Sequence, residues 1–355
     1  MESQGELRLN PSSGTSVITP PPARQKSVEQ LRRRKQRDWS HLKPGIIDGS
    51  ECPFCPGHEK MTPSEIRVYR QKGSLPNESG WWVRVIPNLY PALEQSLPSE
   101  LIEMEERGPF LVTSAFGYHY VIIEMPEHNG SLANASQHQV REVFSMWRDL
   151  MTQVGSDRNI QYCFLFKNHG PLAGASIVHP HSQLIALPTI PTRIINELRG
   201  TRRFWETNKN CFYCAEIEWE RRAKERIVAE TENFLAWCLF TSKTPYQVVV
   251  SPKFHQSYWA NISTHPQGVD QLTEFSSLVR EILKRIEKLL SDPDYSFYLH
   301  TAPPNQPELL YYHWHLQIEP ATEAVVAGFE RGSGTHINPR WPEDAARDLR
   351  EISID

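Results

Sequence analysis

The sequence predicts an α+β protein with two tandem domains of similar build, and three observations support this prediction. At 355 residues the chain is long enough for two domains that each bury a core. The pattern Cys-x-x-Cys, then a histidine, then His-x-His-x-Gln occurs twice. The same order of apolar segments accompanies each copy of the pattern. We therefore predict one domain at residues 1–195, which carries the catalytic site, and another at residues 196–355.

The first copy is predicted to contain two strands, one helix and two more strands. The strands are short apolar runs that end at turn residues, whereas residues 137–154 have helical apolar spacing. On that helix one side carries Val140, Val143, Phe144, Trp147, Leu150 and Met151. A loop that contains Gly170 and Gly174 separates the last two strands. The four strands are expected at 82–86, 118–124, 162–166 and 177–187.

The second copy repeats this order after a charged helical stretch at 219–226, which joins the two copies. Its helix is expected at 269–290, again from apolar residues at helical spacing. The four strands are expected at 234–239, 246–251, 296–300 and 312–319. The matching order of elements supports duplication independently of the cysteines.

Composition excludes several classes of function. A net charge of −4 provides no general attraction to nucleic acid or to an anionic membrane. A basic segment at 31–37 is interpreted as a solvated helix face rather than a nucleic-acid contact. No apolar stretch is long enough to cross a bilayer, and the first residues do not resemble a signal peptide. Six cysteines in so long a chain favour intracellular metal binding over disulfides, so we expect a cytoplasmic protein.

Each copy of the repeated pattern offers the ligands of one tetrahedral metal site. Two cysteines on one tight turn can bind the same ion, and zinc prefers thiolate and imidazole ligands. Four protein ligands leave no open position, so both ions would be structural. Two unrelated loop cysteines are the alternative for either pair, but two pairs with parallel histidines favour zinc. The predicted sets are Cys52, Cys55, His128 and His179, and Cys211, Cys214, His255 and His313.

The first His-x-His-x-Gln segment also offers a nucleophile. On a strand, His179, His181 and Gln183 would project to one side. If His179 binds the metal, His181 remains as a positioned imidazole that can attack phosphorus through one nitrogen. Gln183 would present its amide to a phosphoryl oxygen. The alternative is that His181 is a core histidine whose hydrogen bonds are satisfied within the fold.

The loop before this segment is suited to holding phosphates. Glycines at 170 and 174 permit close approach of backbone N–H groups, and the Ser176 hydroxyl lies in the same loop. Lys167 precedes the loop and could balance phosphate charge. The second segment, His313 to Gln317, has no such loop and is interpreted as structural. A contact of His315 or Gln317 with substrate across a subunit interface is the alternative.

Taken together, these motifs resemble the galactose-1-phosphate uridylyltransferase family of the histidine-triad superfamily, and the neighbouring ADP-glucose phosphorylase branch. The similarity runs through nearly the whole chain. It implies two tandem histidine-triad-like domains, each an antiparallel sheet with packed helices. The segments that carry it are RVIPNLYPAL (84–93), FKNHG (166–170), GAS (174–176), HPHSQ (179–183), GFERGSG (328–334), INP (337–339) and PEDAA (342–346).

The resemblance implies a ping-pong reaction in which His181 accepts a nucleoside monophosphate from a nucleotide sugar and passes it to a phosphorylated acceptor. It implies phosphate contacts for Asn168, Ser176 and Gln183, a nucleoside contact for Asn88, and a phosphate contact for Arg24. The register at Arg24 is less secure, because an additional proline lies there and Ser27 interrupts the basic pattern. Homodimers with sites completed by both subunits are usual in the family.

Three functions remain in competition at this point. The first is transfer of UMP from UDP-glucose to galactose 1-phosphate. The second is an ADP-glucose phosphorylase that transfers AMP to inorganic phosphate through the same histidine. Two departures favour this branch: Leu89 replaces the acidic residue that some uridylyltransferases place at the ribose, and the second metal set is cysteine-rich rather than Glu/His. The third is a zinc-stabilised nucleotide-binding module without catalysis, which would leave no adduct on a histidine.

Overall fold

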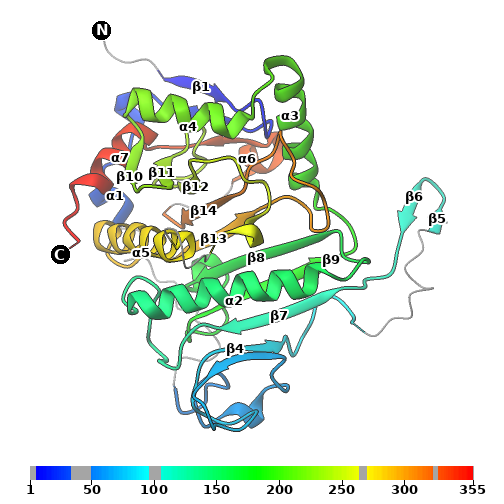
Figure 1. Cartoon of the computed structure of the whole chain (residues 1–355). Coiled ribbons are helices and arrows are strands. Elements are labelled where there is room, and N and C mark those ends of the chain that lie inside the picture. Colours follow the sequence, from blue (N-terminus) through cyan, green and yellow to red (C-terminus); the bar gives the residue numbers. More distant parts are fainter. Residues whose placement is uncertain (1–4, 33–48, 96–104, 264–269, 323–326, 355) are drawn as a thin grey trace.

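The computed structural model describes residues 5–32, 49–95, 105–263, 270–322 and 327–354 (Figure 1). Its centre is a ten-stranded sheet with the strand order β10-β11-β12-β14-β13-β8-β9-β7-β4-β3. Every neighbouring pair in this sheet is antiparallel. The predicted α+β class with antiparallel sheets and packed helices is therefore confirmed.

Each half of the sheet comes from one half of the chain, and the two halves have the same build. The first half contains β3 (Arg67–Arg70), β4 (Trp81–Pro87), β7 (Tyr118–Ile123), β8 (Tyr162–His169) and β9 (His181–Leu187), with helix α2 (Gln137–Gly155). The second half contains β10 (Ile227–Glu230), β11 (Phe234–Cys238), β12 (Val248–Pro252), β13 (Tyr295–His300) and β14 (His315–Pro320), with helix α5 (Gln271–Leu290).

The two halves are joined where β8 pairs with β13, from Tyr295 opposite His169 to Tyr298 opposite Phe166. The strand order on one side of this seam mirrors the order on the other. In this arrangement β9 of the first half corresponds to β14 of the second, and β7 corresponds to β12. The repeated sequence pattern thus becomes a repeated structure within one continuous sheet.

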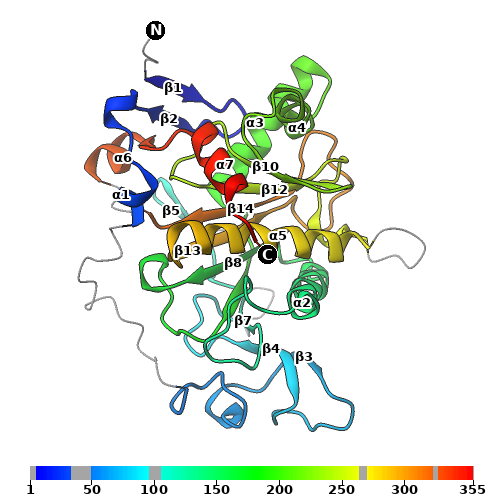
Figure 2. The same cartoon turned by 90° about the vertical axis from the view of Figure 1, so that its left-hand side faces the viewer.

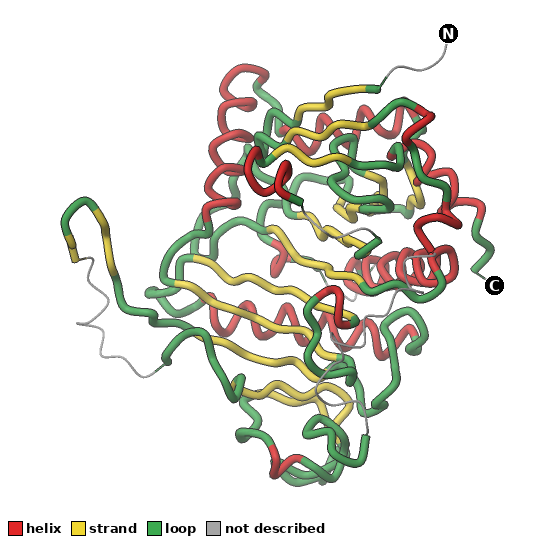
Figure 3. Tube along the Cα trace, turned by 180° about the vertical axis from the view of Figure 1, so that it is seen from behind, coloured by secondary structure: helices red, strands yellow, loops and turns green. Residues whose placement is uncertain are grey.

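Helices α2 and α5 pack against each other and cover one face of the sheet (Figures 1 and 2). Their side chains form one apolar core with the strands, in which Phe144 and Trp147 of α2 meet Phe275 and Phe297. Each helix begins at a capping side chain: Ser136 accepts from the N–H of Gln139, and Asp270 accepts from that of Thr273. Seen from behind, the strands lie in front of these helices, so the opposite face is not covered by them (Figure 3).

Other elements surround the second half. A three-stranded sheet joins both ends of the chain through β1 (Glu6–Leu9), β2 (Ser16–Thr19) and β15 (Thr335–Ile337). A small hairpin, β5 (Glu105–Arg107) and β6 (Phe110–Val112), projects from the first half (Figure 3). The remaining α-helices are α1 (Val28–Arg32), α3 (Thr192–Asn208), α4 (Phe212–Ala223), α6 (Gly328–Ser333) and α7 (Pro342–Glu351). The 3-10 helices in the described residues include η1 (Pro22–Arg24), η4 (Glu59–Met61), η6 (Pro171–Ala173) and η7 (Trp259–Asn261).

Several predicted boundaries were wrong. The strand expected at 177–187 begins only at His181, because residues 177–180 belong to the loop and Pro180 has no N–H for the ladder. The strand expected at 312–319 begins at His315. Of the charged stretch expected to be helical at 219–226, only residues 219–223 are helical, as the end of α4, and α3 was not predicted at all. The basic segment beyond residue 32 and the predicted helix residue at 269 lie outside the described residues.

None of the helices in the described ranges is long and apolar enough to span a membrane.

Candidate active site and metal centres

The predicted nucleophile lies on the face of the sheet that α2 and α5 do not cover. Along β9 the side chains alternate: Leu184 and Ala186 belong to the apolar core under the helices, and Ser182 accepts a hydrogen bond from Trp147. His181 and Gln183 therefore project to the opposite face. His179 lies before the strand begins, so it reaches the metal cluster from the loop rather than from the strand predicted for it.

Hydrogen bonding at His181 leaves one ring nitrogen for chemistry. Its Nδ1 lies 2.8 Å from the backbone carbonyl of His179, so Nδ1–H donates there and Nε2 retains its lone pair. The side chain is buried, with 7 % of the residue exposed. Burial lowers the pKa of His181 to about 4, and the nearby Lys167 charge lowers it further. The imidazole is thus neutral, which is the form a nucleophile requires.

Gln183 is held by a histidine to which the sequence analysis gave no role. His119, on β7, lies with Nε2 2.7 Å from Oε1 of Gln183 and 3.2 Å from Nδ2 of Asn88. The backbone N–H of Ala92 reaches Nδ1 of the same ring at 3.1 Å. The structure therefore brings Asn88, predicted at the nucleoside, next to Gln183, predicted at the phosphate.

The glycine-containing loop follows β8 at the same end of the sheet. Gly170 and Gly174 have φ of 80° and 91°, values that L side chains rarely adopt, so the turn requires glycine. A Cβ on Gly174 would lie 3.5 Å from Nδ2 of Asn168, which places this part of the loop beside Asn168. Asn168 itself accepts a hydrogen bond from Ser296 across the seam. Ser176 is exposed on the loop.

A cavity of about 430 Å³ opens at this end of the sheet. This volume lies in the range of small-molecule sites. Three carboxylates contribute to its wall: Glu287, Asp292 and Asp294. The part of the wall near the predicted site is formed by Lys167, Asn168, residues 177–181 and part of the glycine loop.

Lys167 contributes to the cavity wall but is almost fully buried. It faces the helix-covered side of the sheet, and 1 % of its side chain is exposed. Its ammonium donates to Oε2 of Glu124 at 2.6 Å and to the backbone carbonyl of His181 at 3.1 Å. Its charge is thus paired with a buried carboxylate, and the predicted contact of Lys167 with phosphate stays a prediction. Lys167 also supports the backbone behind the nucleophile.

Arg24 is not among the residues around His181 in the described chain. It lies in η1, directly after β2 of the three-stranded sheet, and the backbone N–H of nearby Lys26 donates to Pro339. Its predicted phosphate contact stays a prediction.

The four predicted ligands of the first metal site lie together. Their donor atoms are all within 4.8 Å of one another. Nδ1 of His128 and Nδ1 of His179 lie 3.4 and 3.5 Å from Sγ of Cys55. Tetrahedral zinc with ordinary Zn–S and Zn–N bonds would separate such atoms by about 3.5 Å. Nε2 of His179 donates to the Met125 carbonyl at 2.8 Å, which directs Nδ1 to the metal position.

The second predicted set has the same geometry. The donor atoms of Cys211, Cys214, His255 and His313 also lie within 4.8 Å of one another. Nδ1 of each histidine lies 3.5 Å from Sγ of Cys214. Backbone carbonyls of Leu309 and Pro252 accept from the opposite ring nitrogens at 3.0 Å. Both clusters can hold a metal ion, and the donor chemistry fits zinc.

Burial and the neighbouring Cys52 raise the pKa of the Cys55 thiol to about 11, so without a cation this thiol stays protonated at neutral pH. A bound divalent ion would reverse this preference and deprotonate the thiol.

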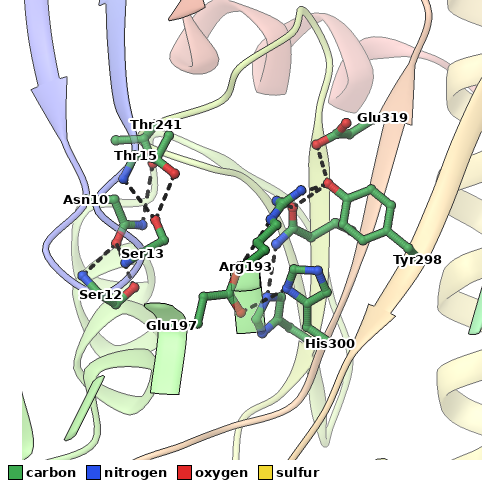
Figure 4. A network of polar contacts seen from close by, with 12 residues as sticks. Asn10, Ser12, Ser13, Thr15, Arg193, Glu197, Thr241, Tyr298, His300 and Glu319 are labelled. Carbon is green, nitrogen blue, oxygen red and sulfur yellow. Dashed lines mark hydrogen bonds and ion pairs between the residues drawn. The ribbon is translucent and has the colours of Figure 1, made fainter. Parts of the chain in front are cut away.

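A third cluster, absent from the predictions, lies in the second half beside the Cys/His set. It consists of Glu197, His300 and His315, with Nδ1 of His300 2.9 Å from Oε2 of Glu197 (Figure 4). Burial alone would raise the pKa of Glu197, but the contact with His300 lowers it to about 2. Glu197 is on α3, a helix that sequence periodicity did not predict, which is why the cluster was missed.

The second half has no open counterpart of the nucleophile. Oε1 of Gln317 accepts hydrogen bonds from Arg193, Tyr298 and Gln247 at 3.2, 2.9 and 3.1 Å, and Figure 4 shows Arg193 directed at Tyr298. The Gln317 amide nitrogen lies 3.0 Å from Nε2 of His315. The nitrogen that would attack is therefore already hydrogen-bonded, in agreement with the structural role expected for this copy.

Comparisons with known proteins cover both halves of the chain. Residues 2–191 match the family model "Galactose-1-phosphate uridyl transferase, N-terminal domain", and residues 198–353 match the corresponding C-terminal domain. ADP-glucose phosphorylase of Arabidopsis thaliana is 33% identical over 98% of this chain and 93% of its own. Galactose-1-phosphate uridylyltransferase of Thermotoga maritima is 28% identical over 99% of both chains.

A solved structure of the Arabidopsis phosphorylase with bound ADP-glucose superposes with a TM-score of 0.80. It is 31% identical and covers 99% of this chain and 100% of its own. The predicted resemblance is confirmed.

Proposed function

Because the chain belongs to the galactose-1-phosphate uridylyltransferase family, we propose that it is a nucleotidyltransferase that moves UMP from UDP-glucose to a hexose 1-phosphate, with galactose 1-phosphate as acceptor. The reaction runs in two half-reactions through a covalent nucleotidyl group on His181. The relatives compared above are enzymes of nucleotide-sugar metabolism by name, which supports this assignment.

In the first half-reaction, Nε2 of His181 attacks the α-phosphorus of the nucleotide sugar. An N–P bond forms, the P–O bond to the sugar phosphate breaks, and hexose 1-phosphate leaves with the electron pair of that bond. In the second, a phosphate oxygen of the acceptor attacks the same phosphorus, and the N–P bond breaks. His181 thereby regains its lone pair, and no oxidant or further reactant is consumed.

The observation that carries this proposal is the hydrogen bonding of His181. Nδ1 is tied to the His179 carbonyl, which leaves the lone pair on Nε2, and His181 and Gln183 project from β9 on the uncovered face of the sheet. Asn168, Gly174 and Ser176 belong to the neighbouring loop region, where amide and hydroxyl donors can stabilise charge that develops on the phosphoryl oxygens. His181 also contributes to the wall of the cavity of about 430 Å³.

A second candidate is an ADP-glucose phosphorylase that transfers AMP to inorganic phosphate through the same His181. Two observations favour it: the relative with 33% identity carries that name, and Leu89 follows Asn88 where an acidic residue would contact ribose in some uridylyltransferases. The two candidates differ in the base and the acceptor, not in the chemistry at phosphorus.

The test is brief incubation of the purified protein with UDP-glucose or ADP-glucose, followed by intact-mass and peptide mass spectrometry. We expect UMP on His181, release of glucose 1-phosphate, and turnover when galactose 1-phosphate is added. AMP on His181 with turnover by phosphate would assign the phosphorylase. His181→Asn should form no adduct while keeping its metal content and melting temperature, and an adduct on any other residue would refute the mechanism.

We further propose that both Cys/His clusters hold structural zinc, so that the bound ions stabilise the fold and take no part in catalysis. When bound, each ion would fix its four ligands, and the first would thereby immobilise the loop that leads into His181. The protein is also proposed to be cytoplasmic. It is proposed to be a homodimer, since Arg24 lies apart from His181 within one chain. The domain boundary at 195/196 is likewise a proposal, and the gap between the two family matches supports it.

A further inference from the structure

We infer that His119 is a positioning residue, which fixes the side-chain amide of Gln183 so that its NH₂ group faces the phosphoryl oxygens of the nucleotide carried by His181. This inference rests on the proposed function and adds to it a residue outside the repeated sequence pattern. His119 lies 64 positions before Gln183 in the chain, on the neighbouring strand β7.

The backbone N–H of Ala92 determines the direction of the hydrogen bonds around the His119 ring. The backbone N–H of Ala92 can only donate, and it points at Nδ1 of His119 at 3.1 Å. Nδ1 must therefore carry its lone pair, so the ring proton is on Nε2. Nε2–H then donates to the atom 2.7 Å away, which is Oε1 of Gln183.

This assignment of the His119 proton leaves the side-chain NH₂ groups of Gln183 and Asn88 available to a ligand. Oε1 of Gln183 is turned to His119, so its NH₂ group points away from that ring. Among the residues that the structure describes, no protein group accepts a hydrogen bond from this NH₂ group. Asn88 presents its NH₂ to the same Nε2 at 3.2 Å, but its Oδ1 is held by the N–H of Tyr90 at 2.9 Å. Since Nε2 is already a donor, the Asn88 NH₂ is also available.

The second half of the molecule contains a corresponding arrangement, in which the group that donates to the glutamine oxygen is known. Val121 pairs with Gln183 in the sheet, and Val249 pairs with Gln317 at the corresponding place. Two residues before each valine lie His119 and Gln247. Gln247 donates its NH₂ to Oε1 of Gln317 at 3.1 Å, and its own orientation is fixed because its Oε1 accepts from the N–H of Lys243 at 2.8 Å.

The second half shows where the glutamine NH₂ group points once the glutamine oxygen is held. With its oxygen held by Gln247, Gln317 places its amide nitrogen 3.0 Å from Nε2 of His315. The corresponding direction in the first half leads from Gln183 toward the phosphorus position next to Nε2 of His181. Among the described residues no hydrogen bond joins Gln183 to His181, so Nε2 keeps its lone pair, unlike Nε2 of His315. A donor fixed in this direction is preorganised for charge that develops on a phosphoryl oxygen.

The experiment is a double-mutant cycle on the rate constant of adduct formation, measured by rapid quench and mass spectrometry with the zinc-loaded protein. The variants are His119→Phe, Gln183→Ala and the double variant. Removing one such donor typically costs about 100-fold to 1000-fold in rate. We expect H119F to lose about tenfold or more at saturating nucleotide sugar, and to change the rate of the Gln183→Ala enzyme by less than about twofold.

Equal slowing by H119F with and without Gln183 would overturn the inference, because His119 would then act independently of the amide. His119→Gln retains an NH₂ donor toward Oε1, so it should recover most of the lost rate; failure to do so at normal zinc content and melting temperature counts against the proposal.

The ring tautomer provides a test that does not depend on activity. Long-range ¹⁵N–¹H correlation spectra of histidine-labelled protein should show the His119 proton on Nε2, and a proton on Nδ1 would refute the hydrogen-bond assignment. If the unaltered protein forms no adduct at all, the proposed function fails, whereas the tautomer result still decides the role of His119.

Discussion

Replacing Lys167 with methionine should strongly destabilise the first half of the molecule. The substitution removes the ammonium that pairs with Glu124 at 2.6 Å, at a place where 1 % and 0 % of the two side chains are exposed. Among the residues that the structure describes, none forms a hydrogen bond with Oε1 of Glu124, so its carboxylate depends on Lys167. Breaking one partner of a buried pair costs about 3–5 kcal/mol. Loss of the bond to the His181 carbonyl adds about 1 kcal/mol.

Denaturant unfolding of the zinc-loaded protein, monitored by tryptophan fluorescence, measures this loss. The double variant Glu124→Met with Lys167→Met removes both charges, and apolar replacement of a buried pair is often neutral. It should therefore lie within about 2 kcal/mol of the unaltered protein, the remaining deficit being the unpaired carbonyl of His181.

Arg202→Ala is the matched control, because Arg202 pairs with Glu206 on the surface at 65% and 58% exposure. It should cost less than about 1 kcal/mol. The reasoning is refuted if Lys167→Met costs no more than this control, or if the double variant is no more stable than Lys167→Met alone.

Four further outcomes are expected. Cys55→Ser and Cys214→Ser should each lower bound zinc by about one ion per chain in elemental analysis, and an unchanged content in either would exclude that cluster as a zinc site. His315→Asn should leave adduct formation within about threefold of normal, since Nε2 of His315 is already hydrogen-bonded; a loss of about 100-fold would instead place it in catalysis. Because burial lowers the pKa of His181 to about 4, adduct formation at pH 5.5 should keep most of its rate at full zinc content, whereas an ordinary histidine would be about 90% protonated there. The same shift predicts that the stability contributed by the neutral ring is complete above about pH 6.5 and is lost as pH falls toward 4; stability rising on acidification would contradict the sign.

Much of the site could be predicted because its chemistry is local in sequence. The Cys-x-x-Cys pairs lie on single tight turns, and His179 and His181 are separated by one residue, so spacing alone indicates which atoms can meet. Glycine at 170 and 174 similarly favours a turn with positive φ, and both residues adopt one. Helices α2 and α5 were predictable because their apolar residues recur at the helical period.

The remaining features depend on contacts between distant segments. Apolar periodicity cannot tell which face of β8 meets the helices, and that choice pairs Lys167 with Glu124. His119 looked like any isolated histidine until the pairing of β7 with β9 set it beside Gln183.

Residue type and short spacing were enough to identify the duplicated pattern, the two ligand sets and the candidate nucleophile. Long-range packing was needed to join the two halves in one sheet through β8 and β13, to block the nitrogen of His315 with Gln317, and to hold Gln183 with His119. These contacts depend on the register and facing of neighbouring strands, which are fixed only when the whole sheet packs against α2 and α5.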